Sequence, residues 1–585
     1  MKAFFLFAIS PVQPLIAQSR KTLDLYNGSF LLSHLCNVGI KALKSYPVRS
    51  EVIFPHESIA TKPNRFMALI DGNEADFKSL GEHVQKEIQN EWNKIGNTVL
   101  EHLKLEHTED FDRQMNTYFE YHWLIYPVKR LYHEDYREAE KALGIIKGVR
   151  KFLPLDESGR KCELTGEHNV LYFRGSRRLG MVSAIPVPDH VDLRYVGPEE
   201  TLGAIGLVKR ASGIYLKERY PKEYVPFFPS TSDIALMHLI YTALEKLKIN
   251  LDEIDSQYIF ALKENAKPDD HLDETVIENT KKVYRQILEY KKKITPYYAL
   301  IVFDGDNMGK WFSGAYIKDK SKLKDFQNTL SFQLGKYAAK VRNILKPPKG
   351  QVVYAGGDDL LGFINLQYFF EVIKELRDAF EQIDLTEFTD RKLTFSAGIA
   401  IAHYKEPLTY VLKRAREAEE KAKNNARDSL AITLVKRAGA TVETVYKWKD
   451  LDGQWTIDYM SNVLSQLESH FSDQFIRTFQ VEMLKVLDRE EMEWTRKYPL
   501  EYIMWKEFKR LMTRSYLLKH NDEREKITQV SCLSQNLNKL FTVSQNCPAA
   551  SKKVWSNFFS LLNILMFMER ERKDELTVNV ENICV

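Results

Sequence analysis

The stretch Val352–Phe363 reads VVYAGGDDLLGF, two apolar runs separated by Gly-Gly-Asp-Asp. This pattern predicts a β-hairpin, because glycine tolerates positive φ and aspartate suits turns. Two adjacent carboxylates at the tip also suggest a metal site. An isolated Gly-Gly-Asp-Asp is more often only a turn, so the metal hypothesis depends on the surrounding sequence.

A second acidic group precedes the hairpin. Asp304 and Asp306 follow the apolar run YYALIVF, which predicts a strand that ends in Asp-Gly-Asp. Side chains two residues apart on a strand share a face. We expect the first two strands of this unit to be central neighbours, whose ends bring these acids to Asp358 and Asp359. Carboxylate oxygens suit Mg²⁺ or Mn²⁺, so the sequence predicts a metal site formed by all four aspartates.

The same residues predict phosphoryl transfer, because metals held by carboxylates activate an attacking hydroxyl and neutralise a leaving pyrophosphate. The glycines would let the backbone approach a triphosphate closely. Each nearby base, taken alone, is more often a solvated surface charge. The candidate nucleotide contacts from this region are Asn307, Lys310, Gly356, Gly357, Lys423 and Arg427.

The order of the predicted elements repeats along the chain. Strand, helix, strand, strand, helix, strand, the ferredoxin-like order, occurs near the N-terminus and again from Tyr297. The sequence therefore predicts an α/β (α+β) multidomain protein with two ferredoxin-like domains, a mostly helical middle domain and a C-terminal helical bundle. The predicted domains are residues 1–150, 151–294, 295–447 and 448–585.

Composition limits the class of protein. Hydrophobic residues make up 44% of the 585, which excludes a disordered chain. The net charge of +4 permits contact with nucleic acid but does not require it. Five scattered cysteines indicate a reducing compartment. The apolar runs are too short for a membrane span and the N-terminus does not match a signal peptide, so we expect a cytoplasmic protein.

The combined motifs resemble a known family. YYALIVFDGDNMGK, VVYAGGDDLLGF and LTFSAGIAIAHYKEPL are similar to the second Palm domain of the large subunit of type III CRISPR effector complexes, and the Cmr (type III-B) branch fits best. ISPVQPLIAQSRKTLDLYNGSFLLSHL and PNRFMALI resemble the first Palm domain of that family, and FPSTSDIAL its middle region. The resemblance covers most of the chain.

This resemblance implies an activity and partners. The two Palm domains would face each other with ATP between them, and the GGDD Palm would convert ATP into a second messenger. The product would be a cyclic oligoadenylate or an AMP conjugate with S-adenosylmethionine. Guide RNA and other Cmr-type subunits would form the complex, and bound target RNA would activate it.

The resemblance also assigns residues. Asp304, Asp358 and Asp359 would be catalytic and hold the metal, and Ser396 and Lys423 would touch the nucleotide. The first Palm has HESIATKPNR where the hairpin acids would be, so it is degenerate and would bind the acceptor. The implied acceptor side consists of Asn27, Gly28, Ser29 and Asn64.

The sequence departs from this family in two respects. Many members begin with an HD nuclease domain, but no His-Asp dipeptide occurs here and the first Palm strand begins at Phe4, so we expect no DNA nuclease. The middle domain often carries four zinc cysteines. Here Cys162 is retained, whereas Thr165, Gly203 and Gly206 stand at the other three positions. One thiolate cannot form a structural zinc site, so we expect apolar packing instead of zinc.

Other functions remain open at this stage. The chain could be a catalytically silent architectural subunit, in which the acids are a relic, or a free-standing diguanylate cyclase, which two Palms in one chain make less suitable. Exposed residues of the C-terminal bundle would contact neighbouring subunits or the RNA duplex, although core packing suits the tryptophans better. These candidates are Trp494, Arg496, Trp505, Lys509 and Arg510.

Overall fold

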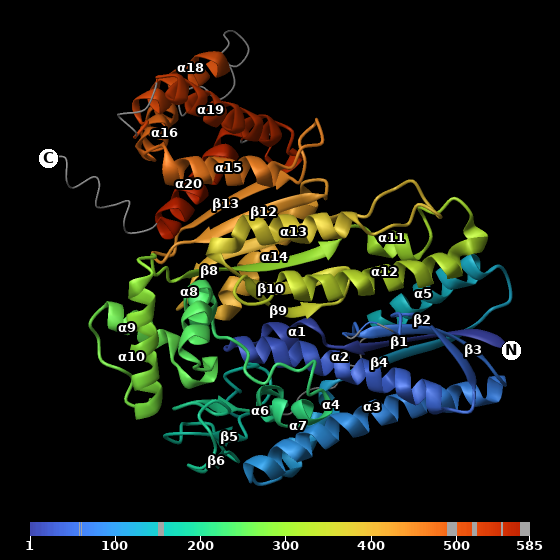
Figure 1. Ribbon diagram of the computed structural model, residues 1–585. Coiled ribbons are helices and arrows are strands. Elements are labelled where there is room, and N and C mark those ends of the chain that lie inside the picture. The colour runs from blue at the N-terminus through green and yellow to red at the C-terminus, as the bar shows by residue number, and fades with distance from the viewer. Residues whose placement is uncertain are drawn as a thin grey trace.

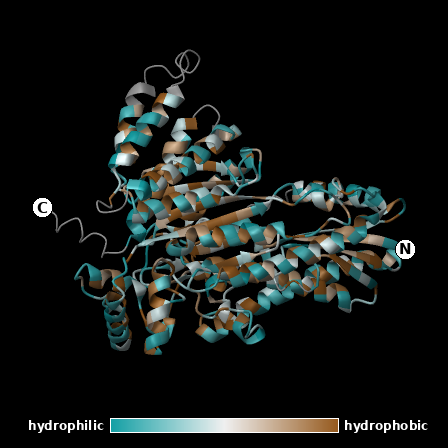
Figure 2. Cartoon of the chain, turned by 45° about the horizontal axis from the view of Figure 1, so that its top comes forward, coloured by the Kyte–Doolittle hydropathy of each residue, from teal (hydrophilic) through white to brown (hydrophobic). Residues whose placement is uncertain are grey.

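The computed structural model shows a mixed α/β chain with two large sheets and a helical C-terminal region, which confirms the predicted fold class (Figure 1). Hydrophobic residues concentrate on the central strands, and the surrounding helices present polar residues (Figure 2). The described residues are 1–57, 59, 61–149, 157–487, 500–517, 523–550 and 554–573.

The first α/β unit is a four-stranded antiparallel sheet in the order β2-β3-β1-β4. Seven consecutive residues of β1 are buried, which places it at the centre of the sheet. The predicted strand–helix–strand–strand–helix–strand order is present. Its elements are β1 (Lys2–Ser10), α1 (Gln13–Ala17), α2 (Thr22–Ser45), β2 (Arg49–Phe54), β3 (Arg65–Asp71), α3 (Glu74–Leu103), α4 (Glu109–Tyr118), β4 (Glu120–Pro127) and α5 (Tyr132–Gly148).

The second α/β unit contains a six-stranded sheet in the order β13-β12-β11-β8-β10-β9. The prediction that its first two strands are central neighbours is wrong: β8 pairs with β10 and β11, and β9 is an edge strand. The chain that follows β8 passes through α12 and enters the sheet again at β9, on the far side of β10, as in a split βαβ unit. The acids still meet, because the hairpin acids lie at the start of β10. The elements from β8 to β11 are β8 (Tyr297–Gly305), α11 (Met308–Phe312), α12 (Leu323–Ile344), β9 (Gly350–Ala355), β10 (Asp359–Asn365), α13 (Phe369–Glu381) and β11 (Phe395–His403).

Two strands extend the second sheet beyond the predicted set. Helix α14 (Leu408–Asn424) connects β11 to the parallel strand β12 (Ser429–Val435), and β13 (Thr441–Lys447) pairs antiparallel with β12. All seven residues of β12 are buried. The continuous apolar run LAITLV lacks the alternation that marks a half-exposed strand, as is usual for a strand covered on both faces.

The two α/β units pack together in a reciprocal way. Helix α2 of the first unit contacts β9 of the second, and α12 of the second contacts β2 of the first. The Ser331 hydroxyl accepts a hydrogen bond from the His56 amide at 2.6 Å. Gly335 on α12 faces Ile59, where an added Cβ would lie 2.4 Å from Ile59 Cγ1. This interface brings the start of β3 close to the β9–β10 hairpin.

The middle region is mostly helical and is joined to α2 through a buried polar cluster. Arg210 on α6 pairs with Asp24 on α2 at 2.8 Å, and both side chains are fully buried. Its elements are β5 (Tyr172–Phe173), β6 (Ile185–Pro186), β7 (Thr201–Leu202), α6 (Ala204–Ala211), α7 (Gly213–Arg219), α8 (Thr231–Leu247), α9 (Ser256–Lys263) and α10 (Glu274–Glu289).

The C-terminal helices pack on the second sheet, with α20 against β13 and α15 against α13. Trp505 contacts the rings of Phe508, Phe541 and Phe558, so it is a core residue. Trp494 and Arg496 lie outside the described residues. The helices are α15 (Thr456–Ser469), α16 (Gln474–Leu487), α18 (Leu500–Arg514), α19 (Glu523–Gln545) and α20 (Val554–Arg572). Within the described ranges, no helix combines the length and apolar character needed to cross a bilayer.

Candidate active site between the two sheets

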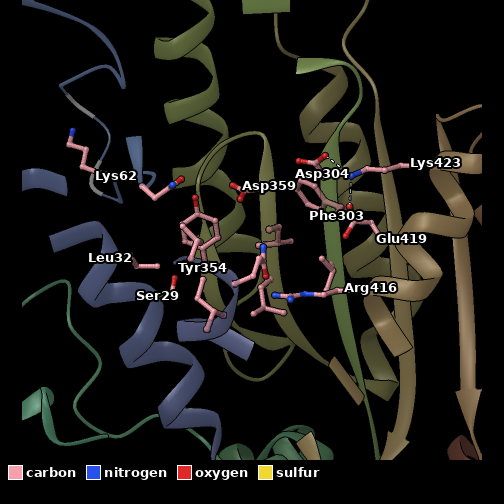
Figure 3. A pocket seen from close by; sticks show the side chains of 17 residues that line it. Ser29, Leu32, Lys62, Phe303, Asp304, Tyr354, Asp359, Arg416, Glu419 and Lys423 are labelled. Carbon is pink, nitrogen blue, oxygen red and sulfur yellow. Dashed lines mark hydrogen bonds and ion pairs between the residues drawn. The ribbon is translucent and has the colours of Figure 1, made fainter. Parts of the chain in front are cut away.

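A cavity of about 370 Å³ lies between the two α/β units. Ser29 and Leu32 on α2 form one wall, and α14 forms the opposite wall (Figure 3). Asp304 at the end of β8, and Tyr354 and Asp359 on the hairpin, lie between these walls. Cavities of this size hold small molecules in other proteins.

Two predicted acids face each other across neighbouring strands. Asp359, the first residue of β10, pairs directly with Asp304 on β8. Side chains at such positions have Cβ atoms about 5 Å apart, and like charges there repel. Asp358 precedes β10 and sits beside Gly305, where an added Cβ would lie 3.3 Å from Asp358 Cβ. The structure therefore brings Asp304, Asp358 and Asp359 together, and the first and last of them line the cavity.

This crowding shifts the protonation of the hairpin acids. Desolvation and the Asp304 charge raise the pKa of Asp358 to about 6, against the opposing effect of Arg65. Desolvation, together with Asp358 and Asp304, raises the pKa of Asp359 well above its ordinary value. The Tyr354 hydroxyl opposes this rise in the Asp359 pKa, but Asp359 Oδ1 is buried without a hydrogen-bond partner among the described residues. The site thus lacks the positive charge that would keep both hairpin acids ionised.

The paired glycines are required by protein contacts. A Cβ at Gly356 would lie 2.1 Å from the Tyr354 hydroxyl and 2.2 Å from Asp359 Oδ1. Gly357 has φ +108°, and a Cβ there would lie 2.9 Å from Leu334 Cβ. Only glycine satisfies both conditions. These contacts within the hairpin explain the glycine pair, so the predicted close approach of a triphosphate is not needed to account for it.

One face of α14 presents charged side chains to the cavity. Arg416, Glu419 and Lys423 follow the three- and four-residue helical spacing and all line it. Lys423 Nζ lies 2.6 Å from Asp304 Oδ2 and 2.6 Å from Glu419 Oε1. Burial lowers the pKa of Lys423, but these two ion pairs outweigh it and leave the pKa raised. Sequence reasoning had found Lys423 but missed Arg416 and Glu419, which the helical spacing could have shown.

Helix α14 lies unusually close to β11 because of one glycine. A Cβ at Gly398 would lie 2.1 Å from both the Ala415 carbonyl oxygen and the Glu419 amide nitrogen. The glycine therefore lets the helix backbone approach the strand, and it fixes how far the charged face stands from Asp304.

Asp306 and Ser396 lie behind the cavity rather than in it. Asp306 is 3% exposed and accepts hydrogen bonds from the hydroxyls of Thr394 and Ser396 and from the Asp428 amide, at 2.7, 2.8 and 2.9 Å. Strand β8 ends at Gly305, so the two-residue rule for a shared face no longer applies. Asp306 as a metal ligand and Ser396 as a nucleotide contact therefore have no support here: the pair ties β8 to β11.

The remaining nucleotide candidates lie outside the cavity lining. Lys310 and Arg427 are exposed. Asn307 has a left-handed backbone, φ +58°, and precedes α11. Arg427 lies in a left-handed turn after α14, with φ +59°. The exposed positions of Lys310 and Arg427 fit the interpretation that they are solvated surface charges better than the prediction that they bind nucleotide.

The predicted acceptor residues divide into two pairs. Ser29 and Asn64 line the cavity; the Asn64 side chain donates to the Ile9 carbonyl oxygen at 3.1 Å. Asn27 is instead buried against the middle region, where it donates to the Arg210 carbonyl oxygen and accepts from the Tyr224 hydroxyl. Gly28 packs against the backbone of Leu15. On a helix, adjacent residues point about 100° apart, so the YNGS segment cannot place all its side chains at one wall.

The donor set suits a hard cation but is not assembled around one. Among the described residues, no three His, Cys, Asp or Glu side chains are grouped as a metal would require. The orphaned Asp359 Oδ1, the adjacent Asp358 and the partly exposed Asp304 offer the oxygens that Mg²⁺ or Mn²⁺ takes. In this structure the Lys423 ammonium forms an ion pair with Asp304 and serves as its counter-ion.

Three of the four positions that correspond to zinc cysteines, Cys162, Gly203 and Gly206, lie together in the middle region. A Cβ at Gly206 would lie 3.1 Å from Cys162 Sγ, and one at Gly203 would lie 3.6 Å from Cys162 Cβ. Cys162 and Leu164 belong to a hydrophobic core cluster. Apolar contacts therefore occupy this place in the fold.

Comparisons with known proteins agree with this architecture. Residues 297–431 match the family model "Cas10/Cmr2, second palm domain", and residues 4–97 match "CRISPR-associated protein Cmr2, N-terminal". A cryo-EM structure of the type III-B Cmr-beta complex bound to cognate target RNA contains a chain with a TM-score of 0.65 and 15% identity, and the match covers 97% of this chain and 83% of that one. At this identity the structural match shows a shared fold.

Curated relatives extend the comparison. The CRISPR system Cmr subunit Cmr2 of Pyrococcus furiosus is 26% identical over 75% of this chain. The subtype III-A single-strand-specific deoxyribonuclease Cas10/Csm1 of Streptococcus thermophilus is 28% identical over 23% of this chain. The chain spans 62% of the length of the first relative and 18% of the second. Residues 4–97 and 297–431 of this chain are therefore similar to the N-terminal region of Cmr2 and to the second palm domain of the Cas10/Cmr2 proteins.

Proposed function

We propose that this chain is the large subunit of a type III-B CRISPR effector complex and a metal-dependent nucleotidyltransferase that acts on ATP when target RNA is bound. The observation that carries the proposal is the direct pairing of Asp304 with Asp359 on neighbouring strands, at a cavity whose opposite side presents Ser29 and Asn64. The similarity to the Cmr2 protein supports the assembly with Cmr-type subunits and guide RNA.

In this proposal the two walls bind different partners of one reaction. Asp304, Asp358 and Asp359 hold Mg²⁺ or Mn²⁺, which when bound neutralises phosphate charge and lowers the pKa of an attacking hydroxyl. Lys423 and Arg416 contact the phosphates of the donor ATP from α14. Ser29 and Asn64 orient the acceptor on the opposite wall.

The transfer balances without any redox partner. The acceptor hydroxyl oxygen forms a bond to the α-phosphorus of ATP, and the bond from that phosphorus to the bridging oxygen of the β-phosphate breaks. Pyrophosphate leaves with the electron pair, and the hydroxyl proton passes to solvent. Cationic side chains fixed beside the phosphates stabilise the developing charge. The acceptor is a second ATP, which yields an oligoadenylate, or S-adenosylmethionine, which yields an AMP conjugate.

A second candidate function is a catalytically silent architectural subunit. The absence of a ready metal-binding group among the described residues favours it, as does the ion pair that already neutralises Asp304. The paired hairpin acids oppose it, because an orphaned carboxylate oxygen and two raised carboxyl pKa values cost stability that a purely structural hairpin would not retain.

The test is ATP turnover by the assembled complex with and without target RNA, analysed by mass spectrometry in the presence and absence of S-adenosylmethionine. We expect Asp358→Ala with Asp359→Ala to abolish the product, while guide-RNA binding and assembly persist. Asp270→Ala, in an exposed loop of the middle region, is the matched control. Equal product from the double variant and the wild type would support the architectural function.

A further inference from the structure

We propose that Glu419 is a positioning residue that holds Lys423 as a movable counter-ion of Asp304. Without nucleotide, Lys423 pairs with Asp304; with nucleotide bound, its ammonium moves to the phosphates while it keeps its contact with Glu419. This inference rests on the proposed function and adds to it how the site changes between the two states.

The two ion pairs of Lys423 differ in exposure. The Glu419 side chain is 14% exposed, whereas that of Asp304 is 41% exposed and borders the cavity. A charge pair weakens as solvent reaches it, because water screens the attraction. The contact with Glu419 is therefore the lasting one, and the contact with Asp304 is the one that a ligand can replace.

The arrangement of α14 supports the same division. Glu419 and Lys423 are four residues apart on one helical face, with the acid N-terminal, which is the favourable orientation for such a pair. Gly398 fixes this part of the helix against β11. Figure 3 shows the Lys423 ammonium between Asp304 and Glu419. Glu419 would therefore keep this ammonium at the cavity wall when Asp304 is released.

Charge also requires Lys423 to move. The Lys423 ammonium would repel a divalent cation held by Asp304, because the two positive charges would be only a few ångströms apart. Arg416, the other cation on this face, also lines the cavity and is attracted by Glu419, so it can share the incoming phosphates. Metal without nucleotide therefore competes with Lys423, whereas metal with nucleotide does not.

The experiment measures Mn²⁺ binding to the full chain by calorimetry, without nucleotide and with a non-hydrolysable ATP analogue. Without nucleotide we expect Lys423→Met to bind Mn²⁺ about tenfold more tightly than wild type. Glu419→Gln should bind it several-fold more weakly, because Lys423 then has Asp304 as its sole partner. With the analogue, the advantage of Lys423→Met should disappear.

The double variant separates positioning from simple charge loss. If Glu419 acts through Lys423, Glu419→Gln should weaken Mn²⁺ binding much less in the Lys423→Met background than in wild type, because only the direct Coulomb effect of Glu419 on the site of Asp304 then remains. An equal weakening in both backgrounds, or an equal effect of Glu420→Gln at the exposed neighbouring position, would overturn the inference. Asp359→Asn should remove Mn²⁺ binding; if neither wild type nor Lys423→Met binds Mn²⁺ under any condition, the proposed function falls with it.

Discussion

Asp304 and Asp306 are two residues apart and have different environments. Asp304 reaches the cavity and pairs with Lys423, whereas Asp306 is buried and accepts three hydrogen bonds. The sequence could predict that an acidic pair ends this strand beside the hairpin. It could not show that the strand stops between the two acids, because strand ends depend on tertiary hydrogen bonds such as that from the Asp306 amide to the Thr394 carbonyl oxygen.

This difference gives a prediction about stability. Asp306→Ala should lower the free energy of unfolding by about 3 kcal/mol, because it leaves buried donors without an acceptor. Asp304→Ala should have a smaller effect, since the ion pair of Asp304 with Lys423 is partly exposed. Urea denaturation of the purified chain measures both. If Asp306→Ala were as stable as Asp304→Ala and instead lost Mn²⁺ binding, Asp306 would be a ligand after all.

At the scale of elements, the sequence predicted helix α14 but not how closely this helix packs on β11. The charge pairs at helical spacing predicted the helix. Arg416, Glu419 and Lys423 are three and four residues apart, so they lie on one face, which lines the cavity. Helix α14 can approach the backbone of β11 only because position 398 is glycine. In the sequence this glycine is simply one small residue in an apolar strand. Strands β12 and β13 were missed because their positions follow from the pairing of β12 with β11 and of β13 with β12, not from local alternation.

Substitution of Gly398 therefore tests whether the close packing of α14 on β11 positions the charged residues at the cavity. Gly398→Ala should force α14 away from β11 and lower the free energy of unfolding by about 2 kcal/mol, as overpacking commonly does. Product formation should fall more steeply than ATP binding, because Lys423 and Arg416 leave their positions. Gly309→Ala is the matched control: nothing lies within 4 Å of a Cβ there, and the change should be neutral or slightly stabilising.

The contact between α2 and α6 should make stability depend on pH. Burial raises the pKa of Asp24, but the Arg210 guanidinium outweighs it and lowers the pKa to about 2. Because this folded-state pKa is below the ordinary value of 3.8, the carboxylate stabilises the fold above about pH 4, and this contribution is lost as the pH falls toward 2.

Chemical denaturation at several pH values measures this effect. At pH 6, Asp24→Asn should unfold more easily than wild type by at least about 2 kcal/mol, the equivalent of the pKa difference. At pH 3 the gap should be smaller, because the wild-type carboxylate is closer to protonation. Asp270→Asn should show no such dependence; a gap for Asp24→Asn that stays constant down to pH 3 would contradict the lowered pKa.

At the scale of the whole molecule, the two α/β units are alike in topology and unlike in charge. Each contributes its first long helix to the other, α2 to β9 and α12 to β2. The repeated strand and helix order predicted this kinship. Which residues of α2 face the cavity could not be predicted, because that depends on how the middle region covers the other side of α2, where Asn27 and Asp24 are buried.

The asymmetry between the units predicts separate roles for their walls. Ser29 is 2% exposed, lines the cavity, and its hydroxyl makes no hydrogen bond within the described part of the chain. If the proposed function holds, Ser29→Ala in the complex with target RNA should raise the acceptor concentration needed for half-maximal rate several-fold, since a hydrogen bond is worth about 1 kcal/mol. Mn²⁺ affinity and donor ATP binding should remain at wild-type values, because the acids and Lys423 are on the opposite unit.

Ser33, one helical turn further along α2, is the matched control. Its hydroxyl accepts the Lys62 amide at 2.7 Å and it does not line the cavity. Ser33→Ala should lower stability without changing product length or the acceptor dependence. If Ser29→Ala and Ser33→Ala behaved alike, with unchanged product yield and length, the first unit would serve only as a scaffold and the acceptor would bind elsewhere. A loss of Mn²⁺ binding in Ser29→Ala would instead show that the two walls form one undivided site.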